Sequence, residues 1–159
     1  MPDGLLRLER ERFPACFGRG GIRADKEEGD GATPTGFLPL RRIFYRADRV
    51  AAPRAAVSVE PIAPQDGWCD DPSDKAYNRR VRLPYDGRHE ALWRADHVYD
   101  LVGVLGWNDD PPVSGRGSAI FLHVNTPDRR PTAGCIALDL VDLQTVLAMG
   151  LEGIEVRLT

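Results

Sequence analysis

The chain has 159 residues, of which 42% are hydrophobic and 28% are charged, a balance typical of a folded domain with a hydrophobic core. We therefore expect a single domain over residues 1–159. The formal net charge of −3 gives no basic footprint for nucleic acid, and no run of about eighteen apolar residues predicts a membrane span.

Short strands bounded by turn residues dominate the chain when it is taken in order. The predicted strands cover residues 5–8, 37–46, 56–62, 77–83, 98–107, 119–124 and 154–158. The strand over 98–107 is apolar on both faces, so we expect it to be central and buried. Residues 27–36 and the irregular stretch 63–75 are predicted loops, and residues 90–93 a helical turn.

One helix is predicted near the C-terminus, with Asp139 as its N-cap and Gly150 as its stop. The apolar residues of its buried face are Leu140, Leu143, Val146 and Leu147. We expect that face to pack on the sheet behind the segment that begins at Cys135.

The three cysteines give neither a disulfide framework nor a metal-ligand spacing. We expect no metal and no other cofactor. Cys16 and Cys69 are interpreted as structural residues, with a disulfide between them as the alternative.

A candidate nucleophilic site lies where one apolar run ends and the next begins. His123 closes the run that starts at Gly117, and Cys135 follows Gly134 at the start of the second run, twelve positions after the histidine. A histidine close to a thiol can take its proton and so generate the nucleophile. A hairpin-like return of the chain would bring the two side chains together, and the amides of Gly134 and Cys135 could hold an oxyanion.

A structural interpretation stands beside the catalytic one. Cysteine is among the most buried residue types, and Cys135 could belong to the core. His123 could be an ordinary histidine with satisfied hydrogen bonds at the end of a strand.

The segments Gly117–His123 and Thr132–Leu138, with the short loop between them, resemble the L,D-transpeptidase catalytic domain family. Residues 26–36 are similar to that family's Gly-Asp-Gly-x-Thr-Pro-x-Gly stretch. Residues 68–72 with Tyr77 and Asn78 are similar to a small single-domain branch found in Gram-negative bacteria.

The resemblance implies a mostly β fold, a sandwich or partly closed barrel with one or two short helices. It implies that Cys135 is the nucleophile and His123 the base, that Thr132 matches the family's Ser/Thr, and that the backbone carbonyl of Val124 orients the base. Two positions depart from the family pattern: Ala133 replaces its usual histidine, and Ala137 replaces a frequent arginine.

Other residues are candidates for contact with substrate. Arg129 and Arg130 could grip a carboxylate, or could simply be solvated in their loop. Trp68, Tyr77 and Asn78 could line a cleft, although Trp68 could instead fill the core.

The resemblance implies peptide cross-linking in peptidoglycan through a thioester on Cys135, with diaminopimelate as acceptor. The donor would be another diaminopimelate (3,3 type) or, as the departures favour, L-alanine (1,3 type). The alternatives are a thiol L,D-carboxypeptidase or endopeptidase of stem peptides, a non-catalytic wall-binding module, and a cytoplasmic thiol hydrolase.

Such a role in cell-wall biogenesis and cell shape predicts a periplasmic location. Residues 1–12 lack the apolar segment of a signal peptide, which leaves the cytoplasm as the alternative location. The sequence predicts no particular oligomeric state.

Overall fold

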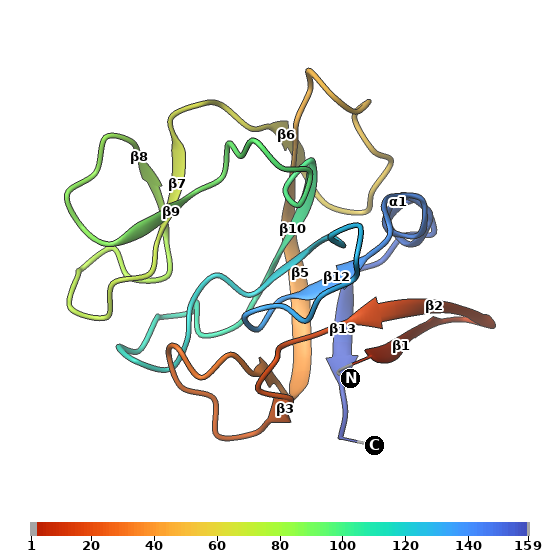
Figure 1. Cartoon of the computed structure of the whole chain (residues 1–159), viewed down its shortest axis with the longest axis horizontal. Coiled ribbons are helices and arrows are strands. Elements are labelled where there is room, and N and C mark those ends of the chain that lie inside the picture. Colours follow the sequence, from red (N-terminus) through yellow and green to blue (C-terminus); the bar gives the residue numbers. More distant parts are fainter. Residues whose placement is uncertain (1–2, 159) are drawn as a thin grey trace.

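A long, open sheet runs through the computed structural model, which describes residues 3–158 (Figure 1). Its path follows β1 (Asp3–Leu8), β2 (Glu11–Cys16), β12 (Ile136–Leu138), β11 (Phe121–Val124), β10 (Leu101–Leu105), β5 (Gly36–Tyr45) and β13 (Gly153–Val156). The short strand β6 (Val59–Pro61) also pairs with β5. Among the described residues the single helix is α1 (Leu140–Ala148), so the fold is mostly β, as predicted.

Two small sheets flank the long one. The first pairs β3 (Ile22–Arg23) with β4 (Thr33–Pro34). The second places β7 (Asp66–Cys69) between β8 (Arg80–Arg82) and β9 (His89–Ala91). In Figure 1 the second sheet stands apart from the long sheet, on the side opposite α1.

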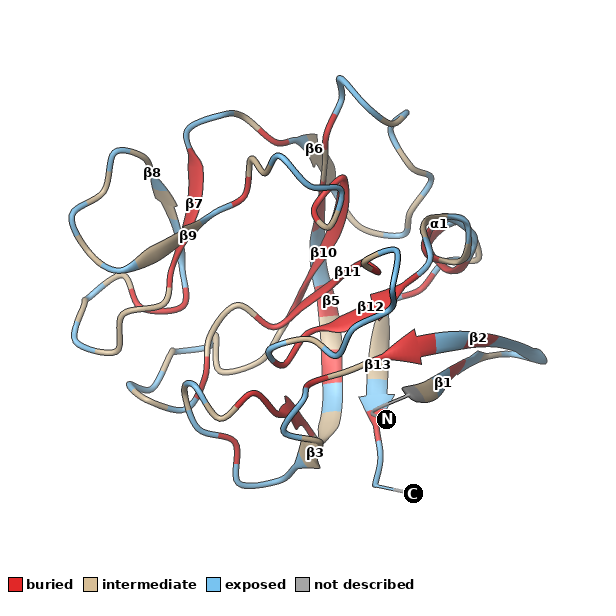
Figure 2. Cartoon of the chain, viewed as in Figure 1, coloured by how far each residue is buried: buried red, intermediate tan, exposed pale blue. Residues whose placement is uncertain are grey.

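Buried residues concentrate in the middle of the long sheet, where all residues of β10, β11 and β12 are buried (Figure 2). This confirms that the apolar run within residues 98–107 is a central strand. Because successive side chains of a strand point to opposite faces, these strands contribute to two separate cores.

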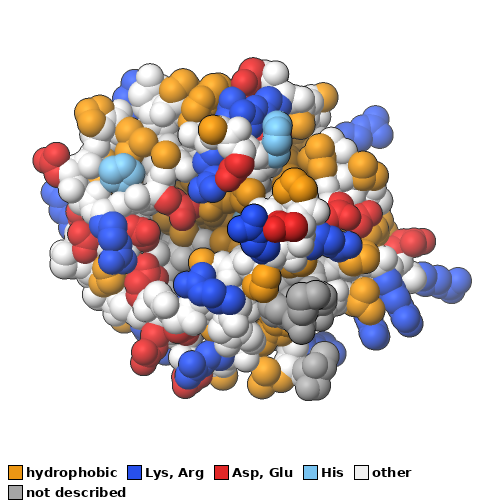
Figure 3. Space-filling view, viewed as in Figure 1, with side chains coloured by type: hydrophobic (Ala, Val, Ile, Leu, Met, Phe, Trp, Pro, Cys, Tyr) orange, Lys and Arg blue, Asp and Glu red, His pale blue; other side chains and the backbone are white. Residues whose placement is uncertain are grey.

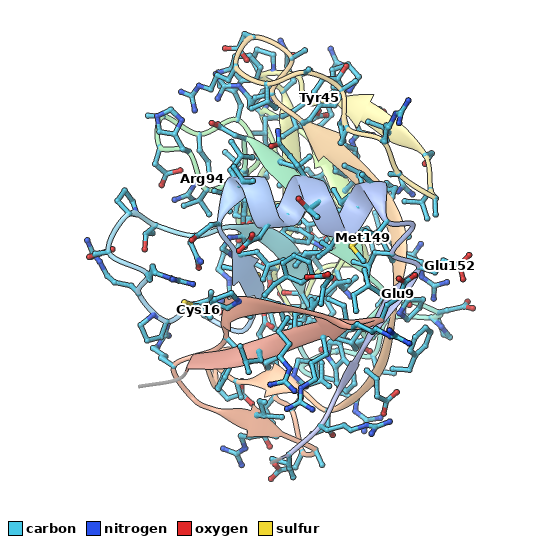
Figure 4. The ribbon with its side chains drawn as sticks, turned by 90° about the vertical axis from the view of Figure 1, so that its right-hand side faces the viewer. Glu9, Cys16, Tyr45, Arg94, Met149 and Glu152 are labelled. Carbon is cyan, nitrogen blue, oxygen red and sulfur yellow. The ribbon has the colours of Figure 1, made fainter. Side chains whose placement is uncertain are left out.

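The first core lies between the sheet and α1, which crosses one face of the sheet (Figure 4). Leu122, Ile136 and Leu138 of the strands share this core with the helix residues Leu143, Val146 and Leu147. Full burial of one such side chain stabilises the fold by about 1.5–3 kcal/mol. The helix therefore anchors the strand that follows Cys135, as predicted.

The second core occupies the opposite face. It contains Phe121, the first residue of β11, and Cys135, which directly precedes β12. Trp68, Leu92 and Tyr99 belong to the same core. The ring of Phe121 meets Trp68 edge-on, with their centroids 5.2 Å apart. Cys135 is thus part of a packed layer that is also formed by the small sheet.

The residues predicted to start and stop α1 lie at its two ends, but the predicted capping hydrogen bond of Asp139 is absent. Asp139 precedes the helix and Gly150 follows it with φ +90. The Asp139 side chain makes no capping hydrogen bond, because its carboxylate accepts one from Asn125 Nδ2 at 2.9 Å.

Two sequence predictions were wrong, and one strand was not predicted at all. The stretch 63–75 contains β7, residues 89–91 form β9 where a helical turn was expected, and the N-terminal hairpin has a second strand, β2. The strands β7 and β9 pair with each other across a long intervening segment, which local propensity does not reveal, whereas β2 pairs with its neighbour β1. No disulfide joins Cys16 to Cys69, so that alternative is also wrong.

Candidate active site

The two candidate catalytic residues are presented by neighbouring strands that run parallel. Leu122 pairs with Ile136 and His123 with Ala137, and Cys135 stands immediately before β12. The predicted hairpin-like return is therefore wrong. Residues 125–135 carry the chain back along β11 to start β12 in the same direction, because parallel strands need a crossover connection.

The Cys135 thiol lies in a buried backbone pocket. Its Sγ accepts a hydrogen bond from the amide of Phe121 at 3.4 Å and donates to the carbonyl of Ala119 at 3.2 Å. Burial, followed by the negative charge of Glu90, raises the pKa of the Cys135 thiol to about 12. At neutral pH the resting nucleophile is the protonated thiol.

The raised pKa predicts the reactivity of this thiol. Since only the thiolate reacts with iodoacetamide, we expect the rate constant for alkylation of Cys135 to rise about tenfold per pH unit from pH 7 to 10. Cys135→Ala gives the background from the other two cysteines. A plateau near pH 7 would instead indicate a thiolate–imidazolium pair and contradict the prediction.

The His123 ring is oriented by its own strand. Its Nδ1 lies 2.9 Å from the carbonyl oxygen of Val124. Since a carbonyl can only accept a hydrogen bond, Nδ1 carries the proton and Nε2 is left as a base. Burial lowers the pKa of His123 to about 4, so the ring is neutral at pH 7. The ring meets Tyr99 edge-on at 5.5 Å between centroids.

Both residues line one cavity of about 510 Å³, together with Thr132, Arg130 and Glu90. Its remaining lining residues come from the segments around residues 26–29, 88–99, 118–119 and 126–137 and from Asp70. In residues 3–158 the hydrogen bonds of Sγ run to the backbone of residues 119 and 121 and not to the imidazole. The thiol must therefore leave the Ala119 carbonyl before it can give its proton to His123.

The backbone before the nucleophile is held in an unusual conformation. Gly134 has φ +136, and a Cβ there would lie 2.8 Å from the carbonyl oxygen of Ala32. Its own carbonyl accepts a hydrogen bond from Thr33 Oγ1 at 2.8 Å. The position requires glycine for both conformation and space.

Thr132 ties this loop together through its hydroxyl. Oγ1 accepts from the Gly134 amide at 3.1 Å and donates to the Cys135 carbonyl at 2.6 Å. The Gly134 amide is thus already engaged within the loop. Of the two amides predicted to hold an oxyanion, we retain that of Cys135 as the candidate.

Replacing this hydroxyl should weaken the loop. We expect Thr132→Val to lower the free energy of unfolding by about 1–3 kcal/mol, because two backbone groups lose their partner. Urea denaturation measures the change. Thr145→Val is the control, since Thr145 donates only to Val141 on the exposed surface of α1. An equal decrease in the free energy of unfolding in the two variants would show that the hydrogen bonds of Thr132 do not stabilise the loop more than a surface contact does.

The two arginines of the crossover loop differ in position. Arg130 lines the cavity and pairs with Asp128. Arg129 is not among the lining residues; its side chain is 41% exposed and lies 3.8 Å from Asp139. Its carbonyl accepts a hydrogen bond from Cys16, which lies at the end of β2 beside this loop (Figure 4).

The structure does not bring Trp68, Tyr77 and Asn78 into the cavity that contains Cys135. All three are buried and support the approach to β11. Asn78 Oδ1 accepts hydrogen bonds from the Trp68 indole and the Ala119 amide, both at 3.0 Å. Tyr77 OH accepts from the Gly117 amide at 3.0 Å. Trp68 and Asn78 do line a second cavity of about 370 Å³ behind this support.

Sequence reasoning missed a half-buried acid in the cavity that contains the nucleophile. Glu90 accepts a hydrogen bond from Tyr99 OH, and both residues line the cavity. Burial raises the pKa of the Glu90 carboxyl. Glu90 had been placed in a helical turn, and the strand pairing that turns it toward the cavity has no local signal.

A family model described as the L,D-transpeptidase catalytic domain (YkuD) matches residues 5–157. The chain therefore belongs to the L,D-transpeptidase catalytic domain family, as its motifs implied. Comparison with curated proteins and with solved structures gave no match.

Within residues 3–158 no group of three or more His, Cys, Asp or Glu side chains is arranged to hold a metal ion. The helix of that same region is too short to cross a bilayer.

Proposed function

We propose that this protein is a peptidoglycan L,D-transpeptidase that forms a thioester on Cys135. The observation that carries the proposal is that a thiol and a neutral imidazole line one cavity in a chain of this family. The geometry of the loop from Thr132 to Cys135 supports it, because that loop places an amide next to the nucleophile.

Acylation begins from the neutral pair. His123 Nε2 takes the thiol proton as Sγ attacks the peptide carbonyl of the donor stem, and the Cys135 amide stabilises the oxyanion. The leaving amine takes the proton from His123, which leaves a thioester and a neutral imidazole. The amine of an acceptor diaminopimelate then attacks the thioester carbonyl and forms the cross-link.

The wall of the cavity supports the 1,3 type of cross-link, with L-alanine as the donor residue. Ala133 and Ala137 both line the cavity, at positions where the family commonly has histidine and arginine. Smaller, uncharged side chains change which donor the site accepts. Detection of only diaminopimelate–diaminopimelate cross-links would contradict this choice.

The proposed function is tested by analysing muropeptides after purified sacculi are incubated with the wild type or with Cys135→Ala. New cross-linked species with the wild type alone are expected, and their mass identifies the joined residues. Trimmed monomers without cross-links would mean that water resolves the thioester, and the protein would be a carboxypeptidase or endopeptidase. No change would favour a wall-binding module.

A peptidoglycan substrate supports a periplasmic location for the proposed enzyme. Fractionation of native cells tests this location, and recovery in the cytoplasm would instead support a hydrolase of small peptides.

A further inference from the structure

The charges that line the active-site cavity are unevenly compensated. Four cations face it, and each pairs with a carboxylate: Lys26 with Asp30, Arg88 with Asp70 and Glu28, Arg94 with Asp96, and Arg130 with Asp128. Glu28 and Asp70 also line the cavity, and both are paired with Arg88. Within the described residues, Glu90 is therefore the one lining carboxylate that forms no ion pair.

The surroundings of Glu90 hold it close to the reacting groups. In residues 3–158 its one side-chain hydrogen bond comes from the hydroxyl of Tyr99, and the ring of Tyr99 contacts that of His123. The Arg94 guanidinium lies over the Tyr99 ring, 5.2 Å from the ring centroid. The guanidinium donates its hydrogen bonds to the carboxylate of Asp96. Glu90 and Cys135 line the same cavity, and the negative charge of Glu90 contributes to the raised pKa of the thiol.

Glu90 is half-buried, and a partly desolvated carboxylate without a counter-ion is costly unless a ligand supplies the cation. On the proposed function, the second substrate supplies one. The side-chain amine of diaminopimelate arrives as an ammonium ion and must reach the thioester carbonyl on Cys135. We propose that Glu90 binds the ammonium group of the acceptor stem and takes the first of its two departing protons.

The proton balance of the second half-reaction requires such a group. The ammonium loses one proton to the Glu90 carboxylate and becomes a nucleophilic amine. The amine nitrogen forms its bond to the thioester carbon while His123 Nε2 takes the second proton. The C–S bond then breaks, the thiolate leaves and receives the proton from His123, and Glu90 releases its proton to solvent. The products are an amide cross-link and the original thiol.

Several charged and titratable groups act on Glu90 from the surrounding segments. They are Tyr99, Arg94, Asp70 and Glu28, with burial as the largest effect. Burial and the two acids raise the pKa of the carboxyl, while Tyr99 and Arg94 lower it. A carboxyl whose pKa lies above its usual range is a stronger base for the ammonium proton than an exposed one.

Glu90→Gln tests the role because it keeps the shape of the side chain and removes its charge. Transfer is followed by mass spectrometry with a donor stem peptide and a tripeptide acceptor that ends in diaminopimelate. We expect the KM for acceptor to rise at least about tenfold, the loss expected for one charge-assisted contact. Acyl-enzyme formation without acceptor should not fall, because removing the nearby charge favours the thiolate.

Asp70→Asn is the matched control. It also removes a carboxylate from the cavity wall, but one that is already paired with Arg88, so we expect its acceptor KM to stay within about twofold of the wild type. Tyr99→Phe keeps the Glu90 charge and removes the hydrogen bond that lowers its pKa. In the pH profile of the transfer rate, the acidic limb should therefore move to higher pH in Tyr99→Phe. A purely structural role of Glu90 would not produce this shift.

A further arm uses the wild type alone and does not depend on the folding of a variant. An acceptor whose amine carries three methyl groups keeps its charge but cannot attack, and its neutral tert-butyl analogue has the same shape. We expect the cationic analogue to inhibit transfer at least about tenfold more strongly. Equal inhibition, or an unchanged acceptor KM in folded Glu90→Gln, would overturn the role of Glu90. A wild type that makes no cross-links would overturn the proposed function itself.

Discussion

Cys135→Ala should abolish cross-linking and the covalent acyl-enzyme together, with a loss of at least about a thousandfold in rate. No other sulfur in the described residues lines the cavity, so nothing can replace the nucleophile. The variant should fold, because loss of one buried atom costs only about 1 kcal/mol. Intact-protein mass after incubation with donor peptide measures the adduct, and thermal unfolding checks the fold.

Cys135→Ser separates loss of the nucleophile from loss of packing. The hydroxyl can keep hydrogen bonds to the amide of Phe121 and the carbonyl of Ala119, but its proton is far harder to remove than that of a thiol. We expect a loss nearly as large as in Cys135→Ala with the stability of the wild type. If cross-linking persisted in either variant, Cys135 would not be the nucleophile, and the binding-module interpretation of this site would be favoured.

Gly134→Ala should damage both the fold and the site. The backbone at φ +136 is strained for any side chain, and the new Cβ would meet the Ala32 carbonyl at 2.8 Å, a backbone atom that cannot turn aside. We expect a loss of about 2–4 kcal/mol in the free energy of unfolding. The chain must shift to relieve the contact, and since Cys135 is the next residue, acylation should fall at least about a hundredfold even in the folded fraction.

Gly150→Ala is the matched control for this substitution. Gly150 also has a positive φ, +90, but a Cβ there would meet nothing within 4 Å. We therefore expect only the conformational cost of about 1 kcal/mol and normal acylation. Equal destabilisation of the two variants would show that the approach to Ala32 does not constrain the loop. Urea denaturation and adduct mass are measured for both.

The sequence predicted the parts of this protein that carry a local pattern. The apolar run within residues 98–107, the amphipathic helix with its glycine stop and the alternating strand at the C-terminus all have the expected period. His123 and Cys135 were found because their motifs place them at the end and the start of apolar runs. The structure adds that both face the same side of the sheet.

Features that depend on pairing between distant segments escaped prediction. Parallel pairing of β11 with β12 has no signature in a twelve-residue spacing, and a hairpin fits that spacing equally well. One partner of Asn78 lies forty-one positions away at Ala119, so its structural role could not be distinguished from a role in the cleft. Glu90 was overlooked because a three-residue strand between turns resembles a helical turn.

The three-stranded sheet of β7, β8 and β9 belongs to a different part of the architecture from the strands that carry the thiol and the imidazole. It supplies Glu90, and the turns around it supply Asp70 and Arg88. Acidic and basic side chains are interspersed over the face of the molecule drawn in Figure 3. The reactive machinery and the opposing wall are therefore encoded in separate stretches of the chain. A substitution at Glu90 in that wall can change how the acceptor stem is bound while acylation by Cys135 and His123 stays intact, so acceptor recognition and acyl-enzyme formation can evolve separately.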